Sequence, residues 1–244
     1  MALEFYQLTS AGDRASNQDY MAHIINDDYA LFLVADGLGG YSDGEKASRF
    51  FCLGMLKVAE AFSKRMIENP EAVLGAWIDA AIDEMANLFQ SDEISKHAFT
   101  TCVCLYIDKH SVLTGHCGDS RIYRMNSKQI LWRTEDHSIP QQLLSAGKIA
   151  EQDMGLHPEQ NQLTRSINVL KKHRPEIKKY PAIEPGETFL LCTDGFWEHV
   201  KQPELLQLAQ PASGKTTLAK LAQLTVLRAH GGSDNVTVQW VRCF

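Results

Sequence analysis

The protein is 244 residues long, 44% of them hydrophobic, with a formal net charge of -6 at pH 7. This length can bury one well-formed core and the composition does not separate two halves, so we expect a single domain over residues 1–244. The acidic balance disfavours nucleic acid and anionic lipid as partners. The densest basic stretch, within residues 171–179, is too short for a nucleic-acid footprint and is expected to be a solvated loop.

Residues 1–8 lack the basic start and apolar middle of an export signal. No apolar stretch approaches the roughly 18 residues of a membrane helix, so we expect a cytoplasmic protein with no membrane partner. The cysteines contain no CxxC pair and most lie within apolar runs, which predicts reduced thiols without disulfides or zinc. They are Cys52, Cys102, Cys104, Cys117, Cys192 and Cys243.

Short runs rich in β-branched and aromatic residues predict the strands. In chain order they occupy residues 29–35, 101–107, 111–117, 121–125, 130–133, 188–192 and 236–241. Only two to four polar residues separate the second run from the third and the fourth from the fifth, which is the length of a hairpin connection. The sheets are therefore predicted to be mainly antiparallel.

Two longer segments between the first two strands follow helical spacing instead. The first begins after the capping box Ser42-x-x-Glu45, ends at Asn69-Pro70, and has on one face Ala47, Phe51, Met55, Val58 and Phe62. The second covers residues 71–89, with a buried stripe of Val73, Trp77, Ala80, Ala81, Met85 and Leu88. A third helix is predicted over residues 216–228, before Gly231-Gly232.

This order of elements indicates the fold class. Helices that are inserted as a pair, rather than alternating with strands, argue against a doubly wound parallel sheet. We expect an α+β fold in which helices lie outside stacked antiparallel sheets.

Four aspartates mark the boundaries of predicted strands. Asp36, Asp119 and Asp194 each follow a strand, and Asp234 precedes the last one. If the last strand runs antiparallel to the others, the four carboxylates converge at one rim of the sheets. Like charges converge there only if cations neutralise them or the groups protonate.

Divalent metals are the natural counterions for such a cluster. Oxygen ligands favour Mg²⁺ or Mn²⁺ over zinc, and two ions about 3.5–4 Å apart lower the pKa of a shared water. The resulting hydroxide would attack phosphorus in line. Glycines beside the aspartates, at Gly37, Gly195 and Gly231-Gly232, leave room for a ligand, and Gly37 could offer its carbonyl to a metal. A single Asp-Gly is usually a surface turn, but four aspartates at strand boundaries together favour the metal interpretation.

The motifs that carry this pattern resemble the PP2C-type (PPM) metal-dependent protein phosphatases, in their bacterial single-domain form. They are Arg14-x-x-Asn17-Gln18-Asp19, Asp36-Gly37-Leu38-Gly39-Gly40, Gly118-Asp119-Ser120-Arg121, Leu163-Thr164-Arg165, Thr193-Asp194-Gly195 and Ser233-Asp234-Asn235. The resemblance extends from about residue 9 to residue 241 and implies a four-layer αββα sandwich. It also implies hydrolysis of phosphoserine and phosphothreonine by a metal-bound hydroxide, in opposition to a separately encoded Ser/Thr kinase.

The resemblance also implies the metal ligands, two Mn²⁺ or Mg²⁺ ions per active site. Asp36 resembles the carboxylate that bridges both ions, and Asp194 and Asp234 resemble ligands of one ion. The Gly37 carbonyl resembles a ligand of the other ion, with Asp19 beside it directly or through water.

Two further positions complete the implied site. Asp119 resembles part of a weaker third-metal site, shared with Asp194, that many bacterial members contain. Arg14 would clamp the substrate phosphate with its planar fork of donors, although a surface Arg near an N-terminus is usually only solvated.

Some positions depart from the pattern or remain open. Leu38 stands where many eukaryotic members have a His proposed as the general acid, and Gln18 replaces the Glu often found there. The stretch 145–169 resembles the family's mobile flap, and substrate choice is expected to depend on it. His137 matches a family-like segment, where a structural role is favoured over a catalytic one. Some small bacterial members serve type VI secretion control, and no residue here indicates that setting.

Three other functions fit the sequence less well. A permissive P-loop pattern at residues 209–216 lacks its first glycine and follows a predicted short helix rather than a strand. A thiol phosphatase needs an Arg six residues after its Cys, and no cysteine has one. A phosphoprotein-binding pseudoenzyme is disfavoured because the four aspartates are retained.

Overall fold

The computed structural model describes residues 2–38, 43–90, 92, 95–171 and 175–244. The chain forms two compact units. Unit 1 contains residues 18–117 and 166–183, and unit 2 contains residues 2–17, 118–165 and 184–244. The expectation of one domain over residues 1–244 stays a prediction.

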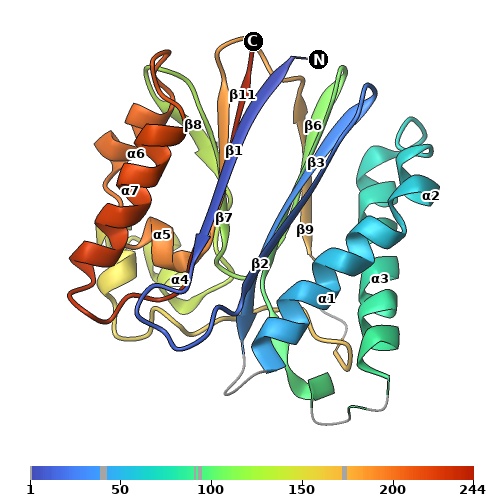
Figure 1. The fold of residues 1–244 in the computed structure, drawn as a ribbon, viewed down its shortest axis with the longest axis horizontal. Coiled ribbons are helices and arrows are strands. Elements are labelled where there is room, and N and C mark those ends of the chain that lie inside the picture. Colours follow the sequence, from blue (N-terminus) through green and yellow to red (C-terminus); the bar gives the residue numbers. More distant parts are fainter. Residues whose placement is uncertain (1, 39–42, 91, 93–94, 172–174) are drawn as a thin grey trace. The chain divides into compact units, whose positions relative to one another are not determined.

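Unit 1 contains a six-stranded antiparallel sheet with the order β2-β3-β5-β6-β9, in which β4 pairs with β3. Its strands are β2 Asp19–Ile25, β3 Tyr29–Leu38, β4 Phe99–Thr100, β5 Cys102–Asp108, β6 Ser111–Cys117 and β9 Glu176–Pro181. Its helices are α1 Asp43–Lys57, α2 Ala59–Ser63, α3 Pro70–Phe89 and the short 3-10 helix η1 Ser95–His97. Within this unit, α1 and α3 cover one face of the sheet (Figure 1).

The core of unit 1 lies between that face and the helices. Phe51, Met55 and Trp77 are fully buried, and the Trp77 Nε1 donates to the Met55 carbonyl at 2.8 Å. Asn69 caps α3 by accepting from the amide of Ala72 at 3.2 Å, as the Asn-Pro sequence suggests. Apolar packing and the hydrogen bond from the Trp77 indole therefore hold α1 and α3 together.

The structure corrects two details of the predicted helices and leaves a third undescribed. The first predicted helix is two helices, α1 and α2, which are separated at Val58. The Ser42 of the proposed capping box lies outside the described residues. Leu88 is 41% exposed, and Phe89 is buried in its place because it lies four residues after the buried Met85.

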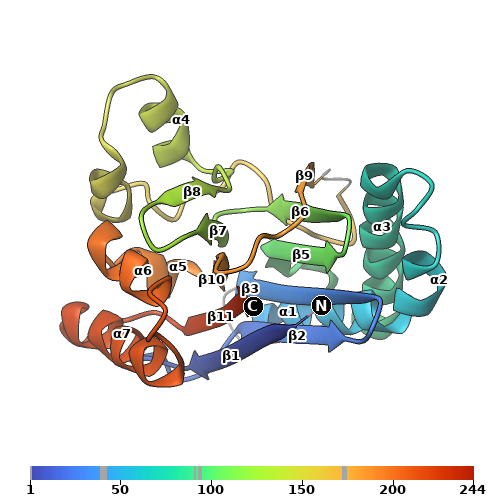
Figure 2. The ribbon, with the colours of Figure 1, turned by 90° about the horizontal axis from the view of Figure 1, so that it is seen from above.

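Unit 2 contains a five-stranded antiparallel sheet with the order β1-β11-β10-β7-β8. Its strands are β1 Leu3–Ser10, β7 Arg121–Met125, β8 Ile130–Arg133, β10 Thr188–Cys192 and β11 Val236–Cys243. Its helical elements are α4 Ile139–Ser145, the 3-10 helix η2 Glu151–Leu156, α5 Asp194–Trp197, α6 Gln202–Leu208 and α7 Lys215–Arg228. The strand β1 runs beside β11 at one edge of this sheet (Figure 2).

The core of unit 2 lies between its sheet and the helices α5, α6 and α7. Trp240 is fully buried, and its Nε1 donates to the Leu208 carbonyl at 2.9 Å. Tyr6 of β1 stacks on the same indole ring with a centroid distance of 5.5 Å. The edge strand β1 is therefore held by side-chain packing as well as by its backbone pairing with β11.

The predicted fold class, α+β with two antiparallel sheets flanked by helices, is confirmed. Each unit supplies one sheet layer and one helical layer (Figure 1). Both predicted hairpins are present, as β5–β6 and β7–β8. The segment before residue 209 is the helix α6, as expected, so the permissive P-loop pattern has no strand before it.

The basic stretch is corrected in part. Lys178 and Lys179 lie in β9, which pairs with β6, rather than in a loop. Residues 172–174 lie outside the described residues. Both lysine side chains are exposed on this edge strand, which explains why its composition suggested a loop.

The sequence predicts reduced cysteines and no membrane-spanning helix. All six cysteines lie in the described part of the chain, where each is buried and none is joined to another by a disulfide. Among the described residues, no helix has both the length and the apolar character to cross a bilayer.

Candidate active site

The strand register of unit 2 brings three aspartates to one edge of its sheet. The last residue of β10 pairs with the first residue of β7 and with the third residue of β11. Asp194 lies two residues after β10, and Asp119 and Asp234 each lie two residues before β7 and β11. The last strand, β11, runs antiparallel to β10, which is the condition for the expected convergence, and these three aspartates therefore meet at the same edge.

The short helix α5 fixes the geometry of this edge. Asp194 is its first residue, and a Cβ on Gly195 would lie 2.2 Å from the Asn235 carbonyl oxygen, so only glycine permits the close approach. The Trp197 Nε1 donates to the Asp119 carbonyl at 2.9 Å. One helical turn therefore holds the segments that carry all three aspartates.

Like-charge repulsion is evident among these carboxylates. Burial, and then the charges of Asp194 and Asp136, raises the pKa of Asp119 well above its ordinary value. Burial, and then Asp194, Asp119 and Asp234, raises the pKa of Glu198 to about 9. Four carboxylates therefore lie near one another in unit 2, and burial of Asp119 and Glu198 strengthens the repulsion between them.

Glu198 was not among the predicted site residues. It follows Asp194 by four residues, and its backbone amide donates to the Asp194 carbonyl at 3.0 Å, so the two side chains lie on one face of the α5 turn. The spacing Asp-x-x-x-Glu was therefore the available signal. It was missed because a helix of only four residues is hard to predict from periodicity.

This donor set fits hard divalent cations. Its side-chain ligands are carboxylate oxygens, which Mg²⁺ and Mn²⁺ prefer, and positive charge would offset the repulsion that, after burial, raises both pKa values. Asp119, Asp194, Asp234 and Glu198 are the residues of unit 2 that could hold such ions.

Arg14 lies beside the same group of residues, in the loop that follows β1. Its Nη2 is 2.9 Å from the Asp234 Oδ2, and both side chains are partly exposed. The Asn235 Nδ2 fixes this loop by donating to the carbonyls of Ala11 and Ser16 at 3.0 and 2.9 Å. The Arg14 guanidinium therefore lies next to a candidate metal ligand, and it is exposed enough for a phosphate group to contact it.

The other predicted ligands belong to unit 1. Asp19 of β2 and Asp36 of β3 are direct partners in the strand register. The Asp36 amide donates to the Thr101 Oγ1 at 2.9 Å, and the Thr101 amide donates to the Asp36 carbonyl at 2.8 Å. Asp36 therefore lies within β3 rather than after it, because β3 pairs with β2 as far as Asp36 and with β4 at Gly37 and Leu38.

Gly37 follows Asp36 and contacts the start of α1. Its amide donates to the Gln18 carbonyl at 3.1 Å, and a Cβ there would lie 2.0 Å from the Gly44 carbonyl oxygen. Only glycine fits this position. It stays a prediction that Asp36, Gly37 and Asp19 bind the same pair of ions as the carboxylates of unit 2.

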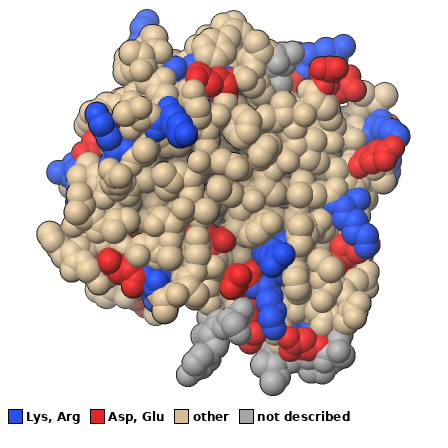
Figure 3. All heavy atoms as spheres, viewed as in Figure 1, with Lys and Arg blue, Asp and Glu red and all other residues tan. Residues whose placement is uncertain are grey.

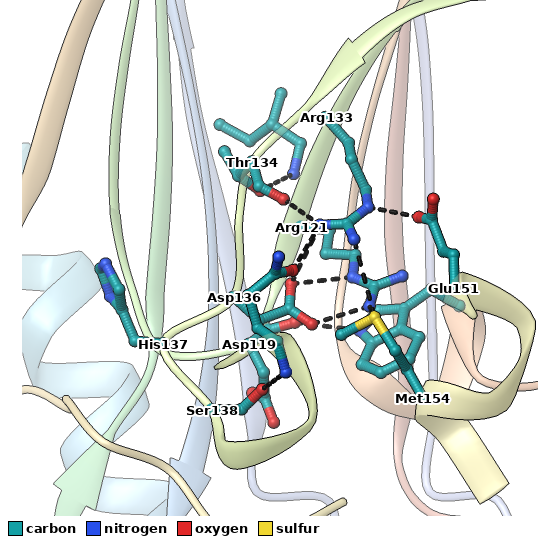
Figure 4. Close-up of polar contacts among 12 residues, drawn as sticks. Asp119, Arg121, Arg133, Thr134, Asp136, His137, Ser138, Glu151 and Met154 are labelled. Carbon is teal, nitrogen blue, oxygen red and sulfur yellow. Dashed lines mark hydrogen bonds and ion pairs between the residues drawn. The ribbon is translucent and has the colours of Figure 1, made fainter. Parts of the chain in front are cut away.

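A buried arginine supports the Asp119 turn. The Arg121 Nε and Nη2 donate to the two Asp136 carboxylate oxygens at 2.9 and 2.7 Å (Figure 4). The guanidinium carbon lies 3.4 Å from the centroid of the Trp197 ring, so the planar cation stacks on the indole that binds Asp119. Arg121 therefore links Asp136 to the turn that carries the candidate ligand.

The predicted flap is anchored to this network. Its residues 145–165 belong to unit 2 and contain η2. Met154 is fully buried and its sulfur accepts from the Arg121 Nη2 at 3.5 Å, while Glu151 forms an ion pair with Arg133 (Figure 4). His137 Nδ1 accepts from the Gly118 amide at 3.3 Å, which agrees with a structural role for this histidine.

Comparisons with known proteins agree with the resemblance in the sequence. A family model described as Protein phosphatase 2C matches residues 10–225. The Serine/threonine phosphatase stp of Listeria monocytogenes is 28% identical over 218 residues, which cover 87% of this chain and 84% of the relative. The Protein phosphatase PhpP of Streptococcus pneumoniae is 29% identical over 248 residues, covering 98% and 97%.

Solved structures show the same fold. The serine/threonine phosphatase Stp1 from Staphylococcus aureus has a TM-score of 0.84 and 28% identity, covering 100% of this chain and 96% of that one. The catalytic domain of the phosphatase PstP, solved with 2 manganese ions, has a TM-score of 0.78 at 23% identity and covers 98% and 97%. The second likeness shows the fold alone.

Proposed function

Since this chain belongs to the protein phosphatase 2C family, it is a protein serine/threonine phosphatase, and we propose that it hydrolyses phosphoserine and phosphothreonine esters with divalent cations held by its carboxylates. The observation that carries this proposal is the meeting of Asp119, Asp194, Asp234 and Glu198 at one sheet edge. Such a cluster is costly without cations and suited to binding them.

The roles of the residues follow the family pattern. We propose Asp36 as the carboxylate shared by two Mn²⁺ or Mg²⁺ ions, with Asp194 and Asp234 on one ion and the Gly37 carbonyl and Asp19 on the other. When bound, the ions supply Lewis-acid charge and activate water as the nucleophile. Metal dependence is expected throughout this family.

Two residues would act at the edges of this site. Asp119, with Asp194 and Glu198, would form a weaker third-metal site. Arg14 would bind the substrate phosphate through its fork of N–H donors, in exchange for its present contact with Asp234. Leu38 cannot protonate a leaving group, so another acid must do so.

We also propose phosphoproteins as substrates, a separately encoded Ser/Thr kinase as the opposing enzyme, and a cytoplasmic location. Lys and Arg are interspersed with Asp and Glu on the face drawn in Figure 3. The expectation that nucleic acid is not a partner stays a prediction.

The test is a phosphatase assay with p-nitrophenyl phosphate and a phosphoserine peptide. We expect both to be hydrolysed with Mn²⁺ or Mg²⁺, and hydrolysis to stop when EDTA is added and to resume with excess metal. Equal turnover in metal-free buffer would contradict the metal-dependent mechanism. A protein that binds phosphopeptide with metal present but never turns it over would instead be a binding module.

A further inference from the structure

The loop that carries Arg14 is fastened to the segment that carries Asp234 by reciprocal hydrogen bonds. The Asp13 amide donates to the Ser233 Oγ at 2.9 Å and to the Ser233 carbonyl at 3.2 Å. In return, the Ser233 amide donates to the Asp13 Oδ2 at 2.9 Å. These bonds join residues that are 220 positions apart in the chain. Each of the two is the immediate neighbour of a proposed functional residue, Arg14 or Asp234.

Gly12 lets this loop lie directly against the same segment. Its φ is +61°, and a Cβ on it would lie 2.1 Å from the Asp234 carbonyl oxygen and 2.5 Å from the Ser233 Oγ. A side chain at this position would therefore clash with the segment. The Arg14 amide donates to the Ala11 carbonyl at 3.1 Å, which closes a turn around Gly12. The backbone position of Arg14 is therefore set by its contact with residues 233–234.

The two ends of this connection differ in their freedom to move. The Arg14 side chain is 58% exposed, and its Nη2 lies 2.9 Å from the Asp234 Oδ2. A long, exposed arginine can adopt many rotamers, so the region that its guanidinium reaches depends on the position of its backbone. Ser233, in contrast, is only 1% exposed. Asp13 therefore ties a residue with a mobile side chain to a buried part of unit 2.

We propose that Asp13 is a positioning residue, which holds Arg14 through Ser233 at the place where the guanidinium binds the substrate phosphate. This inference rests on the proposed function, because it needs Arg14 to bind phosphate. The Asp13 carboxylate acts as a hydrogen-bond acceptor and does not itself contact the substrate. Asparagine keeps an acceptor oxygen at the same distance from the backbone, whereas alanine removes it.

The test measures KM and kcat for p-nitrophenyl phosphate, and the inhibition constant of inorganic phosphate, all with saturating Mn²⁺. Misplacing a binding group by a fraction of an ångström is costly, so Asp13→Ala should raise KM and the inhibition constant by about 5- to 10-fold. The kcat should stay within about 2-fold of wild type, because the lost interaction is made in the bound substrate as well as in the transition state. Asp13→Asn should keep all three values within about 2-fold.

Asn126→Ala is the matched control in unit 2. The Asn126 Oδ1 accepts from the amides of Lys128 and Gln129 at 2.9 and 3.0 Å in the β7–β8 hairpin. This hairpin lies at the end of β7 that is remote from Asp119. The substitution removes the same kind of contact from another loop, so it should leave KM, kcat and the inhibition constant unchanged.

A double-mutant cycle separates positioning of Arg14 from a general effect on the loop. Arg14→Ala alone should raise KM, and adding Asp13→Ala to it should raise KM no further, because no guanidinium is left to position. An equal increase in both backgrounds, or an Asp13→Ala protein with the KM of wild type, overturns the inference.

Failure of the proposed function gives a different pattern. If Arg14→Ala has the KM of wild type, the proposed role of Arg14 is wrong and the role of Asp13 is wrong with it. A wild-type protein that hydrolyses no phosphoester overturns the proposed function itself, and both roles with it.

Discussion

At the residue scale, Asp194 is the most connected of the candidate ligands in unit 2. It is the first residue of α5, and its charge raises the pKa of both Asp119 and Glu198. Its Oδ1 accepts from the Gly195 amide at 2.6 Å, which an asparagine carbonyl can also do. Substitution by Asn therefore removes the charge while keeping the local backbone.

We expect Asp194→Asn to lower kcat for p-nitrophenyl phosphate by about 100-fold or more. Mutation of a residue that only hydrogen-bonds to a metal ligand typically costs about 10- to 100-fold in activity, and loss of the ligand itself should cost more. The circular dichroism spectrum should not change. Asp83→Asn, which makes the same change on the exposed side of α3, is the control and should keep full activity. Near-normal turnover by the Asp194 variant would exclude this residue from the metal site.

Glu198 gives a prediction about pH. In the metal-free protein its pKa, about 9, lies above its ordinary value of 4.5, so between these pH values the native state keeps a proton that the unfolded state releases. Stability should therefore fall as pH rises through this range. With EDTA present, the melting temperature of Glu198→Gln should exceed that of wild type at pH 8, and the two should converge near pH 4.5.

The prediction is contradicted if the difference in melting temperature between wild type and Glu198→Gln is the same at all pH values. Such a result would mean that neither burial nor the charges of the neighbouring aspartates raises the pKa of Glu198. A titration with Mn²⁺ at pH 8 is the matching control, because bound cations should reduce the difference.

Much of this site could be predicted from residue types. Aspartates beside glycines at strand ends identified Asp119, Asp194 and Asp234, because short buried strands have clear apolar runs. The contacts that position them could not be predicted. The stack of Arg121 on Trp197 joins residues 76 positions apart in the chain, and no local pattern encodes that pairing.

At the element scale, the ion pair of Arg121 in β7 with Asp136, just after β8, is the main buried polar feature of the β7–β8 region. Both side chains are nearly inaccessible, with 4% and 1% exposed. We expect Asp136→Asn to cost about 3–5 kcal/mol in the free energy of unfolding, because it leaves a buried guanidinium without its counterion. Urea unfolding followed by tryptophan fluorescence measures this loss.

Glu60→Gln is the matched change in an exposed pair. Glu60 pairs with Lys64 at 2.7 Å on the helical surface of unit 1, and both side chains are more than two-thirds exposed. Its loss should change stability by less than about 0.5 kcal/mol. Equal effects of the two substitutions would mean that water reaches the Arg121 pair.

The longer strands that the sequence did not predict have a common physical feature. The strands β1 and β9 lie at sheet edges, and β2 is also an edge strand. Their residues are mostly intermediate or exposed, so they lack the continuous apolar runs that identified β3, β6 and β10. Edge strands are specified largely by their partner, which a local pattern does not contain.

At the scale of the whole molecule, the proposed ligands come from both units. If Asp36 of unit 1 and Asp234 of unit 2 hold the same ions, then Asp36→Asn and Asp234→Asn should each remove most of the stabilisation by Mn²⁺. That stabilisation should reach about 2.7 kcal/mol at a metal concentration 100 times Kd. Calorimetric melting with and without Mn²⁺ measures it independently of activity.

The Asp83→Asn protein again serves as the control and should keep the full shift. If only Asp234→Asn lost the stabilisation, the ions would be held by unit 2 alone. The proposed role of Asp36 would then be wrong, although the carboxylates of unit 2 would still bind metal.

The pairing of β1 with β11 has a consequence for biosynthesis. The register joins Leu3 to Cys243 and Ser10 to Val236, so β1 is translated long before the strand with which it pairs. Unit 1 has all its residues once position 183 has been made, whereas unit 2 cannot close its sheet until β11, Val236–Cys243, has been made. Until then the nascent chain carries unpaired strand edges, which chaperones can bind and proteases can cut.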